Sequence, residues 1–283
     1  QEFVDKRVTP FKKGQINLNL ARKIIDEVAG KIYSLRLSWI GEPTLHSGLI
    51  DLAKYAKKKN IKEISFLTNG YKLDMDYFLK LVNAGVDLIT VSIDGMDETY
   101  NKIRAPLKFD ETLKKLRDIS DFKQNNNLEK PLIKIQGVWP AVKENPERFY
   151  NTFAPLVDLI AFNPLIDYLH NDKDIVYEND FACPQHYQRI VIGSNGKAAM
   201  CSSDDFMDID IGDANKNSIY DIWHGELFKK VRALHEKQDG FKSLKPCKNC
   251  FYPRKMQEDE KAHINGREIR IESYINRAQE VGK

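Results

Sequence analysis

The chain has 283 residues, of which 42% are hydrophobic and 30% are charged, enough to bury a core in one large domain or in a large and a small one. The formal net charge is +3, from 44 basic and 41 acidic residues, so nothing in the charge points to a nucleic acid or an anionic membrane as a partner. No apolar run approaches the ~18 residues of a membrane span and no signal peptide opens the sequence, so we expect a cytoplasmic protein.

Apolar segments rich in β-branched and aromatic residues recur along the first part of the chain. The predicted strands are residues 33–39, 63–68, 87–93, 132–139 and 159–166. Between them lie amphipathic segments with apolar residues at spacings of three and four, which predict helices. Asp74 and Asp110 are expected as N-caps and Gly85 as a C-cap. This alternation predicts an α/β fold with a parallel sheet, which either a doubly wound sheet or a barrel would satisfy.

Four of the predicted strands end in unusually polar segments, "WIGEP", "LTNG", "SIDG" and "IQGVW". The carboxyl ends of parallel strands share one edge, where ligands bind in both fold types. Gly, Asn and Asp also make good strand-to-helix turns, which explains "TNG" or "SIDG" alone equally well. Four such ends together favour a ligand site over turn chemistry.

The pattern changes after residue 180. "YQRIVIGSNGKAAMC" predicts a hairpin that turns at "SNG", and residues 218–237 predict one helix capped by Ser218. "PCKNCFYPRK" then forms a Cys-x-x-Cys knuckle. We therefore expect two domains, residues 1–175 and residues 176–283, the second ending in a helical tail.

The four cysteines all lie in this last third. They are Cys183, Cys201, Cys247 and Cys250. The hairpin can bring the first two together, and the knuckle places the last two on one metal or cluster. Four thiolates match the ligand set of a Zn²⁺ site or an iron–sulfur cluster. Zinc ribbons usually offer two short pairs and only one pair here is short, so spacing alone leaves zinc and a cluster both open. Buried inert cysteines are a third alternative, although Lys and Asn around the knuckle make it a poor core segment.

At this point the sequence resembles a known family. "CPQHYQRIVIGSNGKAAMC" followed by "CKNC" resembles the auxiliary-cluster domain, called SPASM or twitch, of radical S-adenosylmethionine (SAM) enzymes. "GEP" and "VSIDGMDETYNKIR", each after a strand, resemble the SAM-binding motifs of the same superfamily. The resemblance implies a partial (β/α)6 barrel of the TIM type with a small auxiliary [4Fe–4S] cluster domain at its C-terminal side.

The resemblance also implies roles for the polar strand ends. Glu42 would accept the α-amino group of SAM, Ser92 and Asp94 would face its ribose or methionyl part, and Arg104 would hold its carboxylate. Thr68, Asn69 and Gln136 have weaker claims. The cofactor-binding residues implied are Gly41, Glu42, Pro43, Thr68, Asn69, Ser92, Asp94, Arg104 and Gln136, and the metal ligands are Cys183, Cys201, Cys247 and Cys250.

One departure from the family pattern concerns the Cys-x3-Cys-x2-Cys loop that ligates the cluster which cleaves SAM. The loop normally precedes the Gly–Glu–Pro strand, and its place here falls at or before Gln1. Five of six barrel strands can be counted, and the missing one would be the first. We expect the loop, with a second [4Fe–4S] cluster, upstream of Gln1; the alternative is a protein that lacks the loop and is not a radical enzyme.

The reaction implied by the resemblance is oxidative. In these enzymes a 5′-deoxyadenosyl radical removes a hydrogen atom from the substrate, and an auxiliary cluster with four cysteine ligands serves as electron acceptor. The cysteine count and spacing most resemble the aminocyclitol dehydrogenase type, which indicates oxidation of a small sugar- or cyclitol-like substrate. Trp139, Asp167, Tyr168 and His170 are candidates to line the substrate pocket, although core packing explains Trp139 and a loop explains His170 equally well.

The sequence also allows other reactions. A peptide-modifying radical enzyme, a sugar or peptide epimerase, and a non-catalytic module with a structural metal are the alternatives. An epimerase must return a hydrogen atom, commonly from a Cys thiol, and all four thiols are already assigned to the cluster. The family implies a flavodoxin- or ferredoxin-type electron donor, and we expect no nucleic-acid or membrane partner.

Overall fold

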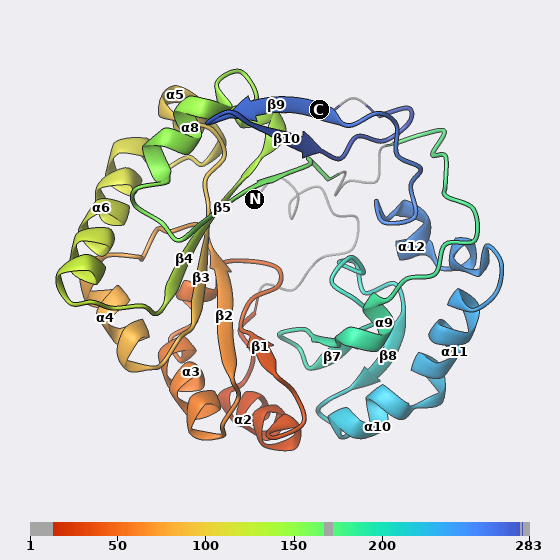
Figure 1. Cartoon of the computed structure of the whole chain (residues 1–283). Helices are drawn as coiled ribbons and strands as arrows, with labels where there is room; N and C mark the ends of the chain where they lie inside the picture. The colour runs from red at the N-terminus through yellow and green to blue at the C-terminus, as the bar shows by residue number, and fades with distance from the viewer. Residues whose placement is uncertain (1–13, 167–171, 278, 280–283) are drawn as a thin grey trace. The chain divides into compact units, whose positions relative to one another are not determined.

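The computed structural model describes residues 14–166, 172–277 and 279. The chain divides into two compact units (Figure 1). We call the described residues of 29–165, 259–272 and 279 the sheet unit, and those of 14–28, 166–258 and 273–277 the cysteine unit. The predicted boundary at residues 175 and 176 stays a prediction. None of the described helices is long and apolar enough to cross a membrane.

The sheet unit is built on five parallel strands in the order β1-β2-β3-β4-β5. They are β1 (Ser34–Arg36), β2 (Glu63–Thr68), β3 (Leu88–Ser92), β4 (Leu132–Val138) and β5 (Leu159–Asn163). All five predicted strands are present, and the order in space follows the order in sequence. This is the α/β architecture expected, with a parallel sheet that carries its helices as crossovers.

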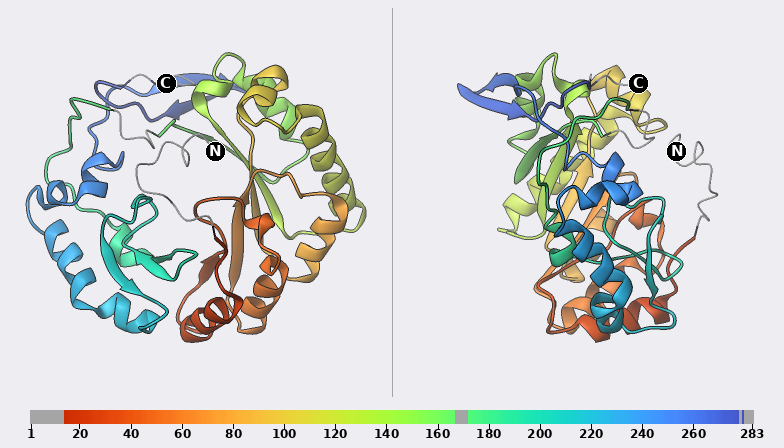
Figure 2. Two further views of the ribbon diagram at one scale, coloured as in Figure 1. Left: turned by 180° about the vertical axis from the view of Figure 1, so that it is seen from behind. Right: turned by 90° about the vertical axis from the view of Figure 1, so that its right-hand side faces the viewer.

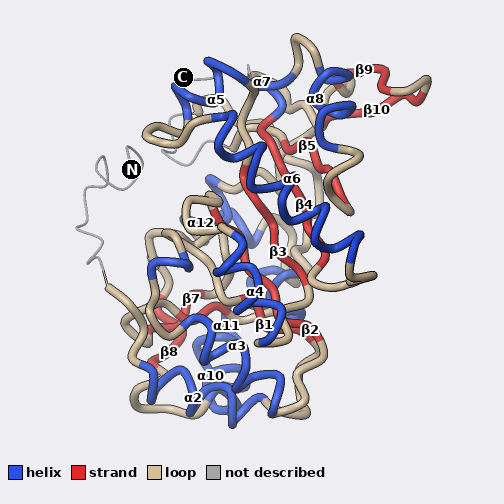
Figure 3. Tube along the Cα trace, turned by 90° about the vertical axis from the view of Figure 1, so that its left-hand side faces the viewer, coloured by secondary structure: helices blue, strands red, loops and turns tan. Residues whose placement is uncertain are grey.

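Helices cover one face of this sheet (Figures 1 and 3). They are α3 (Leu49–Lys58), α4 (Met75–Asn83), α5 (Asp97–Ile103), α6 (Phe109–Asn125), α7 (Trp139–Val142) and α8 (Pro146–Phe153), with the short 3₁₀ helix η1 (Pro43–Leu45) after β1. Alternate residues of β2 and β4 are buried, among them Ile64, Phe66, Ile133 and Ile135. The residues between them are half-buried or, at Leu132, exposed, so the alternation identifies one well-covered face of the sheet and one more open face.

Helix ends follow the local chemistry of the sequence, with one correction. Asp74 caps α4 by accepting a hydrogen bond from Tyr77 N, and Gly85 follows the end of α4 at φ +76°; both expectations are confirmed. The expected cap at Asp110 is wrong. Helix α6 begins at Phe109, and Asp110 lies in its first turn, where a carboxylate still complements the positive helix end.

The cysteine unit holds a three-stranded antiparallel sheet and several short helices. Its elements are α2 (Leu18–Val28), α9 (Gln185–Gln188), β6 (Val191–Ile192), β7 (Lys197–Ala199), β8 (Asp210–Asp213), α10 (Ile219–His224), α11 (Glu226–His235), η2 (Gly240–Ser243) and α12 (Lys245–Asn249). The expected hairpin is β6–β7, with Gly196 at φ +84° in its turn. Helix α2 joins this unit through Glu27, which accepts a hydrogen bond from Ile219 N.

Two expectations about the last third are wrong. The single helix predicted over residues 218–237 is two helices, α10 and α11, which Gly225 separates in an extended conformation (φ −69°, ψ 157°). Ser218 caps α10 as expected. The predicted helical tail is instead the hairpin of β9 (Glu260–Ile264) and β10 (Arg267–Ile271), which packs next to α8 in the sheet unit (Figure 2). Residues 260–264 and 267–271 alternate in side-chain type around the turn residues Asn265 and Gly266, which favours a hairpin.

Candidate cofactor sites

The four cysteines of the chain line a single pocket in the cysteine unit. Cys183 lies just before α9, Cys201 follows β7, Cys247 lies in α12 and Cys250 ends it. The first three are buried, Cys250 is half-buried, and none is in a disulfide. Elements far apart in sequence thus bring all four thiols to one place.

The environment of these thiols is apolar but rich in backbone donors. Burial raises the pKa of Cys201 to about 12 and also raises the pKa of Cys183, and each is further raised by the nearby thiol of Cys250. Backbone N–H groups act in the opposite sense, and Ser203 N donates to Cys201 Sγ at 3.3 Å. Four sulfur ligands that are costly to ionise alone, with amide donors around them, fit a cationic metal centre held by thiolates.

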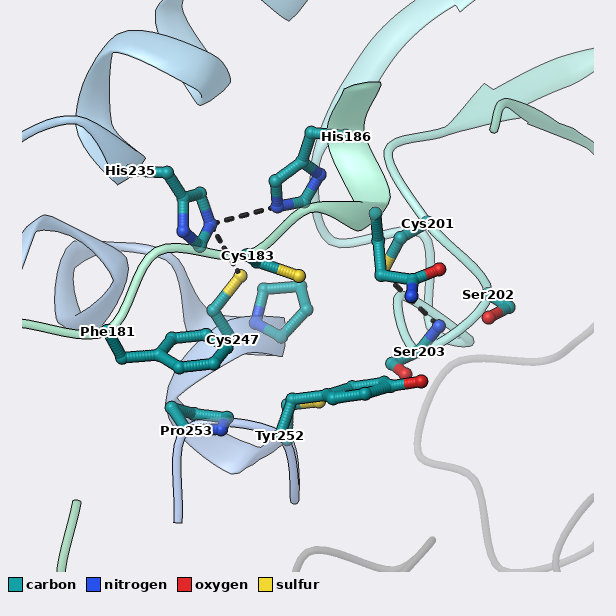
Figure 4. Close-up of a pocket in the computed structure, with 13 residues that line it drawn as sticks. Phe181, Cys183, His186, Cys201, Ser202, Ser203, His235, Cys247, Tyr252 and Pro253 are labelled. Atoms are coloured by element: carbon teal, nitrogen blue, oxygen red, sulfur yellow. Dashed lines mark hydrogen bonds between the residues drawn. The ribbon is translucent and has the colours of Figure 1, made fainter. Parts of the chain in front are cut away.

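Two buried histidines adjoin this pocket (Figure 4). His186 Nε2 and His235 Nε2 lie 2.9 Å apart, and His235 Nε2 lies 3.4 Å from Cys247 Sγ. Burial, followed by the charge of His235, lowers the pKa of His186 to about 4, and burial also lowers the pKa of His235. Both rings are therefore neutral at physiological pH. No sequence pattern indicates this pair, because isolated histidines at positions 186 and 235 carry no spacing signal.

Arg232 clamps the elements that carry the two histidines. Its Nε donates to the carbonyl oxygen of His186 at 3.0 Å and its Nη1 to that of Trp223 at 2.8 Å. The guanidinium also stacks over the rings of Phe228 and Trp223, at 4.1 Å and 4.4 Å from their centroids. These contacts join α9 to α11 and thereby fix the two helices that carry the rings of His186 and His235.

In the sheet unit, Glu42 is the centre of a hydrogen-bonded group at the ends of β1 and β2. Its Oε1 accepts from Thr44 N at 3.1 Å, Thr44 Oγ1 at 2.6 Å and Thr68 Oγ1 at 2.6 Å. Its Oε2 accepts from Asn69 N at 2.7 Å. The carboxylate thus caps η1, which Pro43 begins, and joins two strand ends. The acid between Gly41 and Pro43 therefore has a structural role at these strand ends.

A second polar group joins the ends of β3 and β4. Asp94 is buried, accepts a hydrogen bond from Val138 N at 2.9 Å and forms an ion pair with Arg104. The Nε of Arg104 is buried and has no hydrogen-bond partner within the described part of the chain. An arginine with one donor satisfied by Asp94 and another unsatisfied retains the capacity to bind an anionic ligand group.

The other sequence-predicted residues separate by face. Ser92 and Gln136 are paired neighbours on β3 and β4 and lie on the more open face of the sheet. Thr68 points to the helix-covered face and is 2% exposed, so its hydroxyl serves Glu42. Gly41 is exposed at φ +94°. The nine residues thus form a Glu42 group, an Asp94–Arg104 group and a Ser92–Gln136 pair along neighbouring strand ends.

Of the four residues predicted to line a substrate pocket, one lies in the core and three lie outside the described residues. Trp139 is 2% exposed and packs edge-on against Phe162, with ring centroids 5.9 Å apart, so it belongs to the core. Asp167, Tyr168 and His170 lie outside the described residues, and their assignment to a substrate pocket stays a prediction.

Comparison with known protein families gives two matches. The radical SAM superfamily model matches residues 11–131, a range that includes the Glu42 and Asp94–Arg104 groups. The SPASM model, an iron–sulfur cluster-binding domain, matches residues 183–251. That second range contains all four cysteines and both buried histidines.

The curated relatives are longer proteins. The tungsten-containing aldehyde ferredoxin oxidoreductase cofactor-modifying protein of Pyrococcus furiosus is 25% identical over 235 residues, 79% of this chain and 65% of its own length. The probable GTP 3′,8-cyclase of Methanococcus maripaludis is 44% identical over 66 residues, 23% of this chain and 22% of its own length. The chain therefore spans less than two thirds of each of these relatives.

Solved structures show the same fold at low identity. BtrN in complex with AdoMet and 2-DOIA has a TM-score of 0.57 at 18% identity, over 88% of this chain and 86% of that one. The enzyme anSMEcpe with bound AdoMet and the Cp18Cys peptide has a TM-score of 0.55 at 15% identity, over 83% of this chain and 80% of that one. These likenesses carry the fold alone.

Sheet architecture, pocket cysteines and family matches agree, and they confirm the resemblance found in the sequence. Residues 11–131 form a radical SAM domain and residues 183–251 form a SPASM domain, and SAM and an iron–sulfur cluster are the cofactors of these two domain families.

Proposed function

We propose that the protein is a radical SAM oxidoreductase that oxidises a small polar, sugar- or cyclitol-like substrate by two electrons, with the auxiliary cluster as electron acceptor. The observation that carries this proposal is the convergence of all four cysteines on one pocket. A four-iron cluster with four protein thiolates has no iron site left to bind substrate. Its remaining role is to accept or pass on an electron.

The residues proposed to hold SAM are those of the strand ends. Among the described residues, Oε2 of Glu42 accepts one hydrogen bond, from Asn69 N, and so keeps acceptor capacity for an ammonium group. Arg104, fixed by Asp94, offers donors for a carboxylate. When bound, the cofactors supply hydrogen-atom abstraction and one-electron transfer. The chain contributes the positioning of these two charged ends of SAM.

The proposed oxidation balances as follows. The carbinol carbon of a secondary alcohol loses a hydrogen atom, its hydroxyl group loses a proton and one further electron leaves to the auxiliary cluster. The product is a ketone two hydrogens lighter than the substrate. The hydrogen atom ends in 5′-deoxyadenosine, which makes its origin measurable by isotope transfer. A flavodoxin- or ferredoxin-type protein is the proposed source of the electron that starts each turnover.

The proposal is tested with anaerobically reconstituted full-length protein, SAM, a reductant and substrates deuterated at the carbinol carbon. We expect deuterium in 5′-deoxyadenosine and a ketone product that has lost the carbinol deuterium and the hydroxyl proton. Cys201→Ser should retain SAM cleavage and lose net oxidation, because the electron acceptor is damaged. A colourless protein that binds zinc in the cysteine pocket and fails to cleave SAM would exclude this function in favour of a metal-stabilised module.

A second candidate function is peptide modification, favoured by the SPASM match and by the fold likeness to anSMEcpe, whose structure holds a peptide. The same assay separates the two, since a peptide substrate would then give the deuterium transfer that small alcohols do not. Epimerisation is less favoured, because it needs a hydrogen-atom donor and the four thiols of this chain all line one pocket.

A further inference from the structure

The buried histidine pair sits beside one proposed cluster ligand and has no part in the function proposed above. His186 is 1% exposed and comes from α9, His235 is 3% exposed and ends α11, and Cys247 comes from α12. Figure 4 shows the two ring nitrogens facing each other, with His235 facing the sulfur of Cys247. Burying two polar rings is costly unless their contacts are satisfied, so this arrangement calls for a role.

We propose that His235 donates a hydrogen bond from Nε2 to the Cys247 thiolate of the bound cluster, that His186 holds His235 in the tautomer able to donate, and that the pair thereby raises the reduction potential of the auxiliary cluster. This rests on the ligation of a cluster by the four cysteines proposed above. It makes both histidines positioning residues for an electron acceptor, without assigning them contact with substrate.

A hydrogen bond from His235 to Cys247 requires a proton on the ring nitrogen that faces the sulfur. A metal-bound thiolate can only accept a hydrogen bond, and His235 Nε2 is the ring atom that lies 3.4 Å from Cys247 Sγ. If that nitrogen presented its lone pair, two electron-rich atoms would face each other in a buried site. His235 therefore carries its proton on Nε2.

His186 contacts the same nitrogen of His235 and so affects where that proton lies. Its Nε2 lies 2.9 Å from the same His235 nitrogen, so it must present a lone pair to the shared proton. The Nδ1 atoms of both rings are buried and have no hydrogen-bond partner within the described residues. The backbone of Met200 acts on the His186 ring in the sense that raises its pKa, as an acceptor near a ring N–H does, which agrees with a His186 proton on Nδ1 and a lone pair on Nε2.

The geometry fits donation better than direct metal binding by the histidines. Two nitrogens on one tetrahedral metal at about 2.1 Å would lie about 3.4 Å apart. The observed 2.9 Å is instead a normal hydrogen-bond length. Arg232 holds both elements in place, so the donor stays aimed at the sulfur.

A hydrogen bond to a cluster sulfur changes the reduction potential of the cluster. Reduction adds an electron to a cluster whose sulfurs already carry negative charge, and a hydrogen-bond donor stabilises the reduced form more than the oxidised one. A higher potential suits a cluster that must accept an electron from a substrate radical.

The test measures the reduction potential of the reconstituted 283-residue chain by titration followed with EPR. All of its cysteines lie in this pocket, so any cluster signal reports on this site. His235→Phe should keep about four irons and shift the potential to more negative values, whereas His235→Gln, which retains a donor, should shift it less. His224→Phe, which replaces an exposed histidine of the same unit, should leave it unchanged.

The outcomes are separable. Failure of the unmodified chain to bind iron would overturn cluster ligation itself. Iron bound in His235→Phe with an unchanged potential would overturn this inference alone. Should His235→Phe lose its iron, pulsed EPR of the unmodified chain in ²H₂O decides the matter: an exchangeable deuteron coupled to the reduced cluster and perturbed in His235→Gln supports donation, and its absence rejects it.

Discussion

At the scale of single residues, Glu42 shows how one carboxylate can serve both folding and binding. It accepts hydrogen bonds from Thr44, Thr68 and Asn69, and so ties the segment after β1 to the end of β2. These contacts fix the position of both carboxylate oxygens. Its proposed cofactor contact therefore uses an oxygen that the fold has already placed, which lowers the cost of ordering on binding.

Glu42→Gln is predicted to destabilise the protein even without SAM. An amide keeps one acceptor oxygen but presents its NH₂ group to donors, which costs about 1–3 kcal/mol for donors left unsatisfied. We expect a lower urea midpoint than for the unmodified chain. The control is Glu129→Gln at an exposed position, expected within about 0.5 kcal/mol of the unmodified chain. Equal midpoints for the two variants would contradict the role assigned to Glu42.

His186 gives a pH-dependent prediction for the metal-free chain. Its pKa is lowered from 6.5 to about 4 in the folded state, first by burial and then by His235. Between these values the unfolded chain binds the proton and the folded chain does not, so stability falls as pH drops from about 6.5 to about 4. His186→Phe should flatten this fall, measured as the difference in urea midpoint between pH 7 and pH 4.5. His224→Phe should keep the full slope, and a slope unchanged in His186→Phe would refute the assignment.

At the scale of elements, two hairpins reach a turn glycine in the left-handed region. Gly196 in the β6–β7 turn has φ +84°, and Gly266 in the β9–β10 turn has φ +71°. A Cβ atom on Gly196 would lie 2.1 Å from Asn215 Nδ2, whereas a Cβ on Gly266 would meet nothing within 4 Å. The same backbone conformation is thus packed in one hairpin and open in the other.

Gly196→Ala is predicted to destabilise the protein more than Gly266→Ala. Both substitutions carry the strain of a left-handed alanine, about 1–2 kcal/mol, but only Gly196→Ala also displaces Asn215, which donates to Asn195 O. Because β7 leads into Cys201, Gly196→Ala should also lower the iron bound on reconstitution, while Gly266→Ala should not. Thermal unfolding and iron analysis of the two variants test this, and equal effects would show that Asn215 yields without cost.

At the scale of the whole molecule, the two units carry separate groups of residues that we propose bind cofactors. The cysteine unit holds the four thiols on elements between residues 183 and 250, and the sheet unit holds the Glu42 and Asp94–Arg104 groups. Because a ligand stabilises the structure to which it binds, cluster and SAM should act on different parts of the chain.

Hydrogen exchange is predicted to separate these effects. Reconstitution with iron and sulfide should slow exchange over residues 183–250, since the cluster would join three segments, at Cys183, at Cys201 and at Cys247–Cys250, through bonds to one centre. Addition of SAM should slow exchange at the ends of β1–β4 instead. Mass-spectrometric exchange of the chain with and without each cofactor measures this. Iron-dependent protection confined to the sheet unit would contradict the assignment of the cysteines.

The sequence by itself determined the strands, the helix caps at Asp74 and Ser218, the β6–β7 hairpin and the family, because side-chain periodicity, capping chemistry and cysteine spacing are local properties. It went wrong where local signals were ambiguous. Residues 218–237 keep an apolar periodicity across Gly225, which predicts one helix. The backbone instead turns at Gly225 and two helices result. A Cβ at this position would lie 2.7 Å from Asp221 O, so the turn requires glycine.

Only the tertiary structure decided which distant residues meet. Thr68 and Asn69 serve Glu42, Arg104 pairs with Asp94, and His186 and His235 flank Cys247, although up to 61 positions separate the members of that last set. Isolated polar residues carry no periodic signal, and their partners are set by how strands and helices pack. The sequence therefore shows which residues can act as ligands in the cysteine pocket, but only the fold determines which side chains contact those ligands.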